Sequence, residues 1–264
     1  MTEHDTEAPV GGNEARFLVD YYYALQDFRI QAGNELKAAS KQGEDHAVAQ
    51  WLAVEMARLE HRVARQLDAY SDADPLGRWA RSLIGVGPIL AAGLLAHIDI
   101  SKAPSPSSVW RFAGLDPTAV WNKGEKRPWN GRLKVIAWKL GESFVKTKNH
   151  PRSVYGRLYD ERRAYEEAQN AAGAYADQAA AMLKRARWKD GPARTAYEAG
   201  RLPDGHLHAR CKRYAVKIFL SHYYVVGYRY ATGKNAPRAY ALEHLGHVHE
   251  IPVPNWPFDD ESSS

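Results

Sequence analysis

The amino-acid sequence predicts an all-α fold for this chain of 264 residues. Apolar residues recur every three or four positions in several long segments, the spacing that gathers side chains on one face of a helix. Glycine and proline separate these segments, and no alternation of apolar and polar residues predicts a series of strands. Because 45% of the residues are hydrophobic and 25% are charged, the composition is that of a globular protein with a sizeable core.

Two long helices are predicted in residues 13–72, after a disordered tail at 1–12. The first helix covers about 13–39 and the second about 45–70, with a break at Gly43 between them. Their apolar stripes are Leu18, Tyr21, Leu25, Phe28, Ala32 and Leu36, and Val48, Leu52, Met56, Leu59, Val63 and Leu67. The stripes either close an intrachain hairpin or pair with a second protomer as a coiled coil, so a homodimer through residues 13–70 stays open.

Shorter helices are predicted in residues 73–152, followed by a C-terminal helical region at 153–255 and an acidic tail at 256–264. Ser105 followed by Pro106 is a typical helix start. The predicted short helices are 75–83, 88–98, 106–113 and 131–147. The C-terminal region is predicted to contain helices at 152–186, 192–199, 206–231 and 236–245. The third of these carries Val216, Leu220, Tyr223 and Gly227 on one face.

The sharpest local feature is the turn Gly85-Val86-Gly87-Pro88, which lies between two apolar helical segments. Glycine permits a positive φ and a close backbone approach, the Val86 side chain can pack between the helices, and Pro88 suits a first helical turn. The free amides and the positive end of the dipole at the start of the second helix would then face outward and form a phosphate-binding site. This pattern predicts a helix-hairpin-helix, which holds a nucleic-acid backbone without reading bases; the alternative is a turn that serves packing alone.

A basic, tryptophan-rich segment follows at residues 121–152. It holds nine Lys or Arg and two acids, a local balance of +7 against +5 for the whole chain. Cations neutralise phosphates, and exposed aromatic rings stack on bases. The candidate contact residues are Lys123, Lys126, Arg127, Trp129, Arg132 and Lys134. Trp121 and Trp129 suit core or surface equally, whereas Trp138, in the middle of a helix, is expected in the core.

The cysteine content and the N-terminus favour a cytoplasmic protein. One cysteine, Cys211, excludes an intrachain disulfide, and the first residues show no signal peptide. The apolar stretch at 84–98 is too short and too interrupted to span a membrane. No cofactor is expected, although zinc is compatible with the spacing of His206, His208 and Cys211 and of His244, His247 and His249; the alternative is hydrogen-bonded histidines and a buried thiol.

The segment from about 80 to 148 resembles the C-terminal domain of insertion sequence 110/116/902 family transposases. The resemblance rests on the turn at Gly85, on Ile98-Asp99, on Phe112-Ala113-Gly114-Leu115-Asp116-Pro117 and on the glycine- and lysine-rich loop that follows. It implies DNA recombination or transposition in a mobile element or phage, with DNA or structured RNA as the partner. The helices at 13–70 look like the coiled coil of that family.

The chain departs from this family in its catalytic residues. The resemblance implies a RuvC-like nuclease domain with four carboxylates, but fewer than 90 residues precede the turn and they are predicted to be helical. It also implies a nucleophilic serine after the Gly114-Leu115 segment, where the chain reads Val120-Trp121-Asn122-Lys123-Gly124 and no serine occurs between Ser108 and Ser143. No catalytic residue is therefore assigned, because a serine nucleophile needs its hydroxyl and an activator.

Three functional hypotheses follow from these patterns. The first is a nucleic-acid-binding protein, with DNA as the ligand that the resemblance favours, without transposase catalysis. The second is a recombinase component that acts with a nuclease subunit in trans. The third is a helical interaction protein that dimerises, in which the turn at Gly85 serves packing only.

Overall fold

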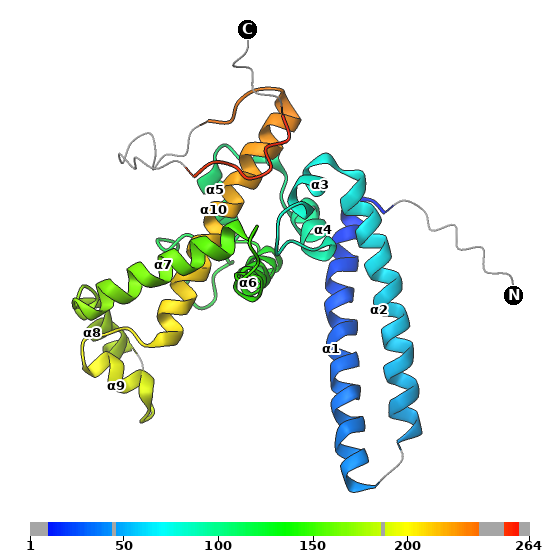
Figure 1. Cartoon of the computed structure of the whole chain (residues 1–264), viewed down its shortest axis with the longest axis horizontal. Coiled ribbons are helices and arrows are strands. Elements are labelled where there is room, and N and C mark those ends of the chain that lie inside the picture. The colour runs from blue at the N-terminus through cyan, green and yellow to red at the C-terminus, as the bar shows by residue number, and fades with distance from the viewer. Residues whose placement is uncertain (1–9, 44–45, 186–187, 238–250, 259–264) are drawn as a thin grey trace, which may run out of the picture. The chain divides into compact units, whose positions relative to one another are not determined.

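The protein is all-α in its computed structural model, which describes residues 10–43, 46–185, 188–237 and 251–258 (Figure 1). Within these residues there are no strands. The predicted tail at 1–12 and the predicted helix at 236–245 lie almost wholly outside the described residues, as does most of the acidic tail at 256–264. The described helices include none that could cross a lipid bilayer. The chain divides into two compact units: unit 1 comprises 1–82 and 86–102, and unit 2 comprises 83–85 and 103–264.

Unit 1 is built on α1 (Gly12–Gln42) and α2 (Ala47–Ala73), which pack side by side as an antiparallel arm (Figure 1). Gly43 ends α1 in the left-handed conformation with φ +75°, as the predicted break requires. Arg29 of α1 forms an ion pair with Glu60 of α2, which is buried, with Nε and Oε2 2.5 Å apart. The two predicted helices are therefore confirmed, and they form an intrachain hairpin.

The short helices α3 (Pro75–Arg81) and α4 (Pro88–His97) complete unit 1. The Asp74 carboxylate caps α3 by accepting from the amides of Leu76 and Gly77, at 2.8 and 3.2 Å. Helix α4 packs on both α1 and α2, and the Arg16 side chain donates to the Ala96 carbonyl. This packing joins α3 and α4 to the arm, so the predicted boundary between residues 72 and 73 falls inside a compact unit.

Unit 2 is organised around α10 (Asp204–Thr232), which packs against α5 (Pro106–Phe112), α6 (Gly131–Lys146) and α7 (Val154–Ala171). The predicted apolar face of α10 is confirmed, because Val216, Leu220, Tyr223 and Gly227 are all buried. Phe144, Tyr155 and Phe219 form a contiguous aromatic cluster there, with ring centroids 4.9 to 5.6 Å apart. A three-residue 3-10 helix, η1 (Ile100–Lys102), belongs to unit 1 and ends it.

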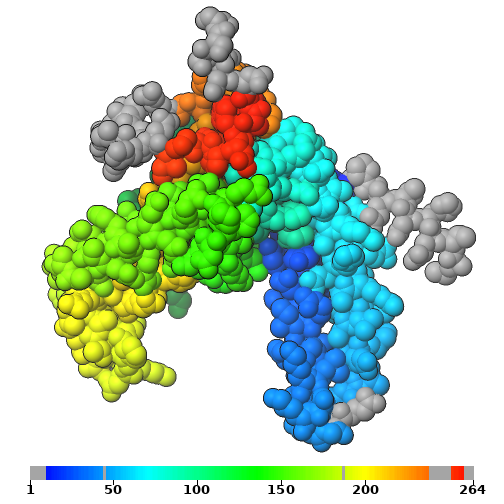
Figure 2. Space-filling model, viewed as in Figure 1, coloured from blue at the N-terminus to red at the C-terminus, as the bar shows by residue number. Residues whose placement is uncertain are grey.

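The predicted single helix at 152–186 is wrong. The segment forms α7 and α8 (Ala176–Arg185), separated by a turn in which Gly173 has φ +81°. An L-residue side chain is strained in that conformation, so the glycine ends α7 there. Helix α8 instead packs with α9 (Pro192–Glu198) around a small core that contains Tyr197 and Leu202, at one end of unit 2 (Figure 2).

Candidate nucleic-acid interface

The turn predicted at Gly85 connects α3 to α4 through residues 82–87. Pro88 is the first residue of α4, as predicted. Val86 is 5% exposed, so its side chain is buried. The first backbone hydrogen bond of α4 runs from the Ala91 amide to the Gly87 carbonyl at 3.0 Å. The amides of Ile89 and Leu90 therefore precede the intrahelical ladder at the positive end of the dipole.

The two glycines of this turn differ in backbone conformation and in the space around them. Gly85 has φ +97°, and a Cβ there would lie 2.9 Å from Phe144 of α6; its carbonyl accepts from the Ser143 hydroxyl at 2.6 Å. Gly87 has φ −85°, is exposed, and would place a Cβ in open space. The expectation of a positive φ thus holds for Gly85 alone, and the close approach at Gly85 is made to α6 of the same chain.

The basic segment comprises the largely exposed loop residues 121–130, helix α6 and the residues that follow it up to 152. Asn130 caps α6 by accepting from the amides of Arg132 and Leu133, at 2.9 and 3.1 Å. The Trp121 indole donates to the Glu125 carbonyl at 2.8 Å and meets the Trp129 ring edge-on, with centroids 6.2 Å apart. Because of these contacts, the loop holds its two tryptophans in defined orientations.

Trp138 contradicts the expectation that it belongs to the core, since it is 58% exposed. The buried side of α6 comprises Leu133, Ile136, Ala137, Leu140, Gly141 and Phe144. At 100° per residue, Trp138 lies about 130° around the helix from the centre of that side. The helical angle in the sequence was therefore the signal that could have placed Trp138 on the surface.

Four tryptophans of unit 2 each have a cation over the indole ring. The distance from Arg127 Cζ to the Trp121 centroid is 5.0 Å, and that from Lys134 Nζ to the Trp129 centroid is 4.3 Å. The other two pairs are Lys212 over Trp138 at 5.7 Å and Lys217 over Trp110 at 4.5 Å. We call these eight residues the tryptophan–cation surface. Such pairs orient both the ring and the charge.

Helix α10 supplies two cations of this surface that the sequence did not indicate. Lys212 forms an ion pair with Glu142 of α6, and the Lys217 carbonyl accepts from the Trp110 indole at 2.9 Å. Burial lowers the pKa of Lys217, and the nearby Asp116 carboxylate opposes that shift. Residues about 100 positions apart in the chain meet here through the packing of α5 on α10, so no local sequence pattern could have predicted the pairing.

The predicted contact residues are only partly brought together. Arg127, Trp129 and Lys134 belong to the tryptophan–cation surface, while Lys123, Lys126 and Arg132 are exposed in the same segment of unit 2. Gly85 also belongs to unit 2, whereas Val86, Gly87 and Pro88 belong to unit 1. The turn and the tryptophan–cation surface are therefore two separate candidate elements.

Two of the histidines considered for zinc, His206 and His208, have protein partners. His208 Nδ1 lies 2.7 Å from the Tyr159 hydroxyl, and His206 Nδ1 lies 3.2 Å from that of Tyr197. Cys211 is buried, and burial raises the pKa of its thiol. In the described part of the chain no three His, Cys, Asp or Glu side chains form a group suited to a metal ion; His244, His247 and His249 lie outside it.

No family model matches the chain, and no significantly similar curated protein or solved structure was found.

Proposed function

We propose that the protein binds nucleic acid, DNA or structured RNA, through the tryptophan–cation surface of unit 2. The observation that carries this proposal is the pairing of four tryptophans with four cations. The eight residues come from α5, α6, α10 and the loop between α5 and α6. Cations attract phosphates and aromatic rings contact bases, so the two side-chain types together suit a polynucleotide. The start of α4, with Gly87 exposed, is a second candidate phosphate contact.

Relatedness to insertion sequence 110/116/902 family transposases is part of the same proposal. It is supported by the succession of α3, the turn at Gly85, α4 and the basic loop, in the order on which the resemblance rests. Thr118, the one hydroxyl in the stretch where the resemblance implies a serine, donates to the Asp116 carboxylate at 2.7 Å. A binding role without strand cleavage fits these residues better than a nuclease subunit acting in trans.

The experiment is a fluorescence anisotropy titration of labelled duplex, single-stranded and hairpin nucleic acids at several salt concentrations. For B-DNA the logarithm of the association constant should fall with the logarithm of salt by about 0.9 per phosphate neutralised. The double variant Lys126→Ala/Arg127→Ala should flatten the slope by about 2, because each of the two removed cations neutralises one phosphate. A salt-independent or absent interaction would refute the proposal.

The matched control removes the same charge from the arm. Lys37 and Lys41 are exposed on α1, and the variant Lys37→Ala/Lys41→Ala should leave the slope unchanged. Equal flattening in both double variants would mean that net charge alone drives binding, which would refute the assignment to the loop. Circular dichroism verifies that each variant remains helical.

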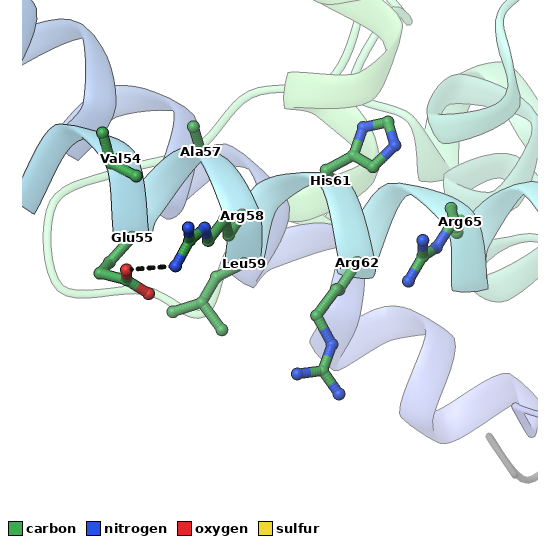
Figure 3. A pocket seen from close by; sticks show the side chains of 8 residues that line it. All are labelled: Val54, Glu55, Ala57, Arg58, Leu59, His61, Arg62 and Arg65. Carbon is green, nitrogen blue, oxygen red and sulfur yellow. Dashed lines mark hydrogen bonds and ion pairs between the residues drawn. The ribbon is translucent and has the colours of Figure 1, made fainter. Parts of the chain in front are cut away.

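A second candidate function, dimerisation through residues 13–70, is favoured by the apolar side chains that the arm leaves exposed. Phe17, Tyr21 and Phe28 of α1 are 57, 50 and 61% exposed, at the spacing of a helical seam. On α2, Arg58, Arg62 and Arg65 line an open depression with Glu55 and Leu59 (Figure 3).

Light scattering should then give a dimer mass for the wild type and a monomer mass for Phe17→Ser/Phe28→Ser. A monomeric wild type contradicts this candidate.

A further inference from the structure

Two tryptophan rings of unit 2 face solvent to an unusual degree. Trp138 is 58% and Trp121 is 42% exposed, although large aromatic side chains are on average strongly buried. Trp138 lies in the middle of α6 and Trp121 in the loop that precedes it. Their exposure leaves apolar ring area available to a planar ligand.

Both rings are held in place. The Trp121 indole donates to the Glu125 carbonyl at 2.8 Å, and its ring contacts both Arg127 and Trp129. Lys212 lies 5.7 Å from the Trp138 centroid and is itself fixed by its ion pair with Glu142. A ring that is already oriented loses little conformational entropy when a ligand stacks on it.

Each of these rings has a cation beside it, Arg127 at Trp121 and Lys212 at Trp138. Lys134 and Trp138 are exposed on α6 one helical turn apart, about 6 Å at 1.5 Å per residue. Lys134 also contacts Trp129, and Trp129 contacts Trp121. Contacts therefore link Trp121, Trp129 and Lys134, and Trp138 follows Lys134 one turn later on the exposed side of α6.

We propose that Trp121 and Trp138 are stacking platforms for unpaired bases, so that the preferred ligand of the tryptophan–cation surface is single-stranded nucleic acid. The proposal rests on the proposed function and names its ligand class. In a duplex the base faces are covered by neighbouring bases, and only the edges and the backbone are accessible to protein. Duplex binding would therefore use the cations and leave the exposed rings without a partner, whereas unpaired bases use both.

The experiment compares labelled oligothymidylate, an abasic oligomer with the same number of phosphates, and a duplex of the same strand length, each titrated into the full chain. The wild type should bind oligothymidylate at least tenfold more tightly than the abasic oligomer. Trp138→Ala should lower the affinity for oligothymidylate about 5- to 150-fold, the range expected when one base loses the aromatic side chain on which it stacks. Its affinity for the abasic oligomer should not change, and Trp138→Phe should restore part of the loss.

The control is Trp51→Ala, because Trp51 of α2 is 61% exposed, close to the exposure of Trp138, but lies on the arm. It should leave every affinity unchanged. Equal binding of base-bearing and abasic strands by the wild type would overturn the stacking proposal and leave phosphate binding intact. A loss of abasic binding in Trp138→Ala would overturn it as well. Failure to bind any of the three ligands at low salt would overturn the proposed function itself.

Discussion

The arm of unit 1 and helix α10 of unit 2 are built from helices of similar length that are buried to very different extents. Helix α1, with 31 residues, buries three, and α10, with 29 residues, buries eleven. Each arm helix packs mainly on one neighbour, whereas α10 has α5, α6 and α7 around it. Hydrophobic stabilisation follows the area removed from water, so the same substitution should cost far more in α10 than in the arm.

Truncating one phenylalanine in each region should give the largest contrast. Phe219 of α10 is fully buried among Phe144 and Tyr155, and Phe28 of α1 is 61% exposed. Phe219→Ala should lower the free energy of unfolding by about 3–5 kcal/mol, and Phe28→Ala by at most about 0.5 kcal/mol. Urea unfolding followed by circular dichroism measures both. A large, concentration-dependent loss in Phe28→Ala would instead show that a second protomer covers this side chain.

Two buried glutamates extend the contrast to charge. Although burial raises the pKa of Glu166, hydrogen bonds from Tyr175, Arg210 and Arg162 lower it overall. Glu60 of the arm has the single guanidinium of Arg29, which is 38% exposed. Glu166 is 1% exposed and its partners Arg162 and Arg210 are 31 and 26% exposed. Glu166→Gln weakens the charge-assisted hydrogen bonds to this buried carboxylate, so it should cost about 1.5–3 kcal/mol.

Glu60→Gln is the matched change in the arm and should cost about 1 kcal/mol or less, because water reaches its partner. The same urea unfolding experiment compares the two variants. Equal losses of stability would mean that the arm depends on its ion pair as strongly as unit 2 depends on Glu166, which contradicts the packing argument.

Acid should weaken unit 2 through His222. Burial lowers the pKa of His222 to about 4, opposed by its hydrogen bond to the Ile251 carbonyl; Tyr155 provides the other ring partner at 2.9 Å. Between pH 6.5 and 4 the unfolded chain binds a proton that the native chain does not. Stability is therefore complete above about pH 6.5 and falls by about 3 kcal/mol as the pH approaches 4.

The measurement is the urea midpoint at pH 7 and at pH 4.5 for the wild type, His222→Gln and His61→Gln. His222→Gln should be less stable at pH 7 but should lose less on acidification, because the titrating group is gone. His61 is exposed on α2, and its replacement should leave the acid loss as it is in the wild type. An unchanged acid loss in His222→Gln would exclude His222 as its source.

The all-α fold, both arm helices and the buried face of α10 could be predicted from the sequence because helical periodicity is local. The prediction for Trp138 is wrong although its helical angle was available, since a position in the middle of a helix does not by itself decide burial. The break at Gly173 is not predicted because alanines on both sides favour helix. The pairs Lys212–Trp138 and Lys217–Trp110 could not be predicted, because they depend on how α10 packs against α6 and α5.

The smallest contrast concerns two glycines that lie two residues apart but belong to different units. An alanine at Gly85 would need a left-handed φ of +97° and would press a Cβ against Phe144 at 2.9 Å, so Gly85→Ala should cost about 1–3 kcal/mol. An alanine at Gly87 meets open space at φ −85°, so Gly87→Ala should change stability by at most about 0.5 kcal/mol.

Gly87→Val therefore tests phosphate binding at the start of α4 without the folding loss expected at Gly85. If the first amides of α4 hold a phosphate, this variant should weaken nucleic-acid binding while its urea midpoint stays close to that of the wild type. Unchanged affinity would mean that the turn serves packing, because Gly85, the glycine with the left-handed φ, lies against α6. The tryptophan–cation surface would then have to account for binding by itself.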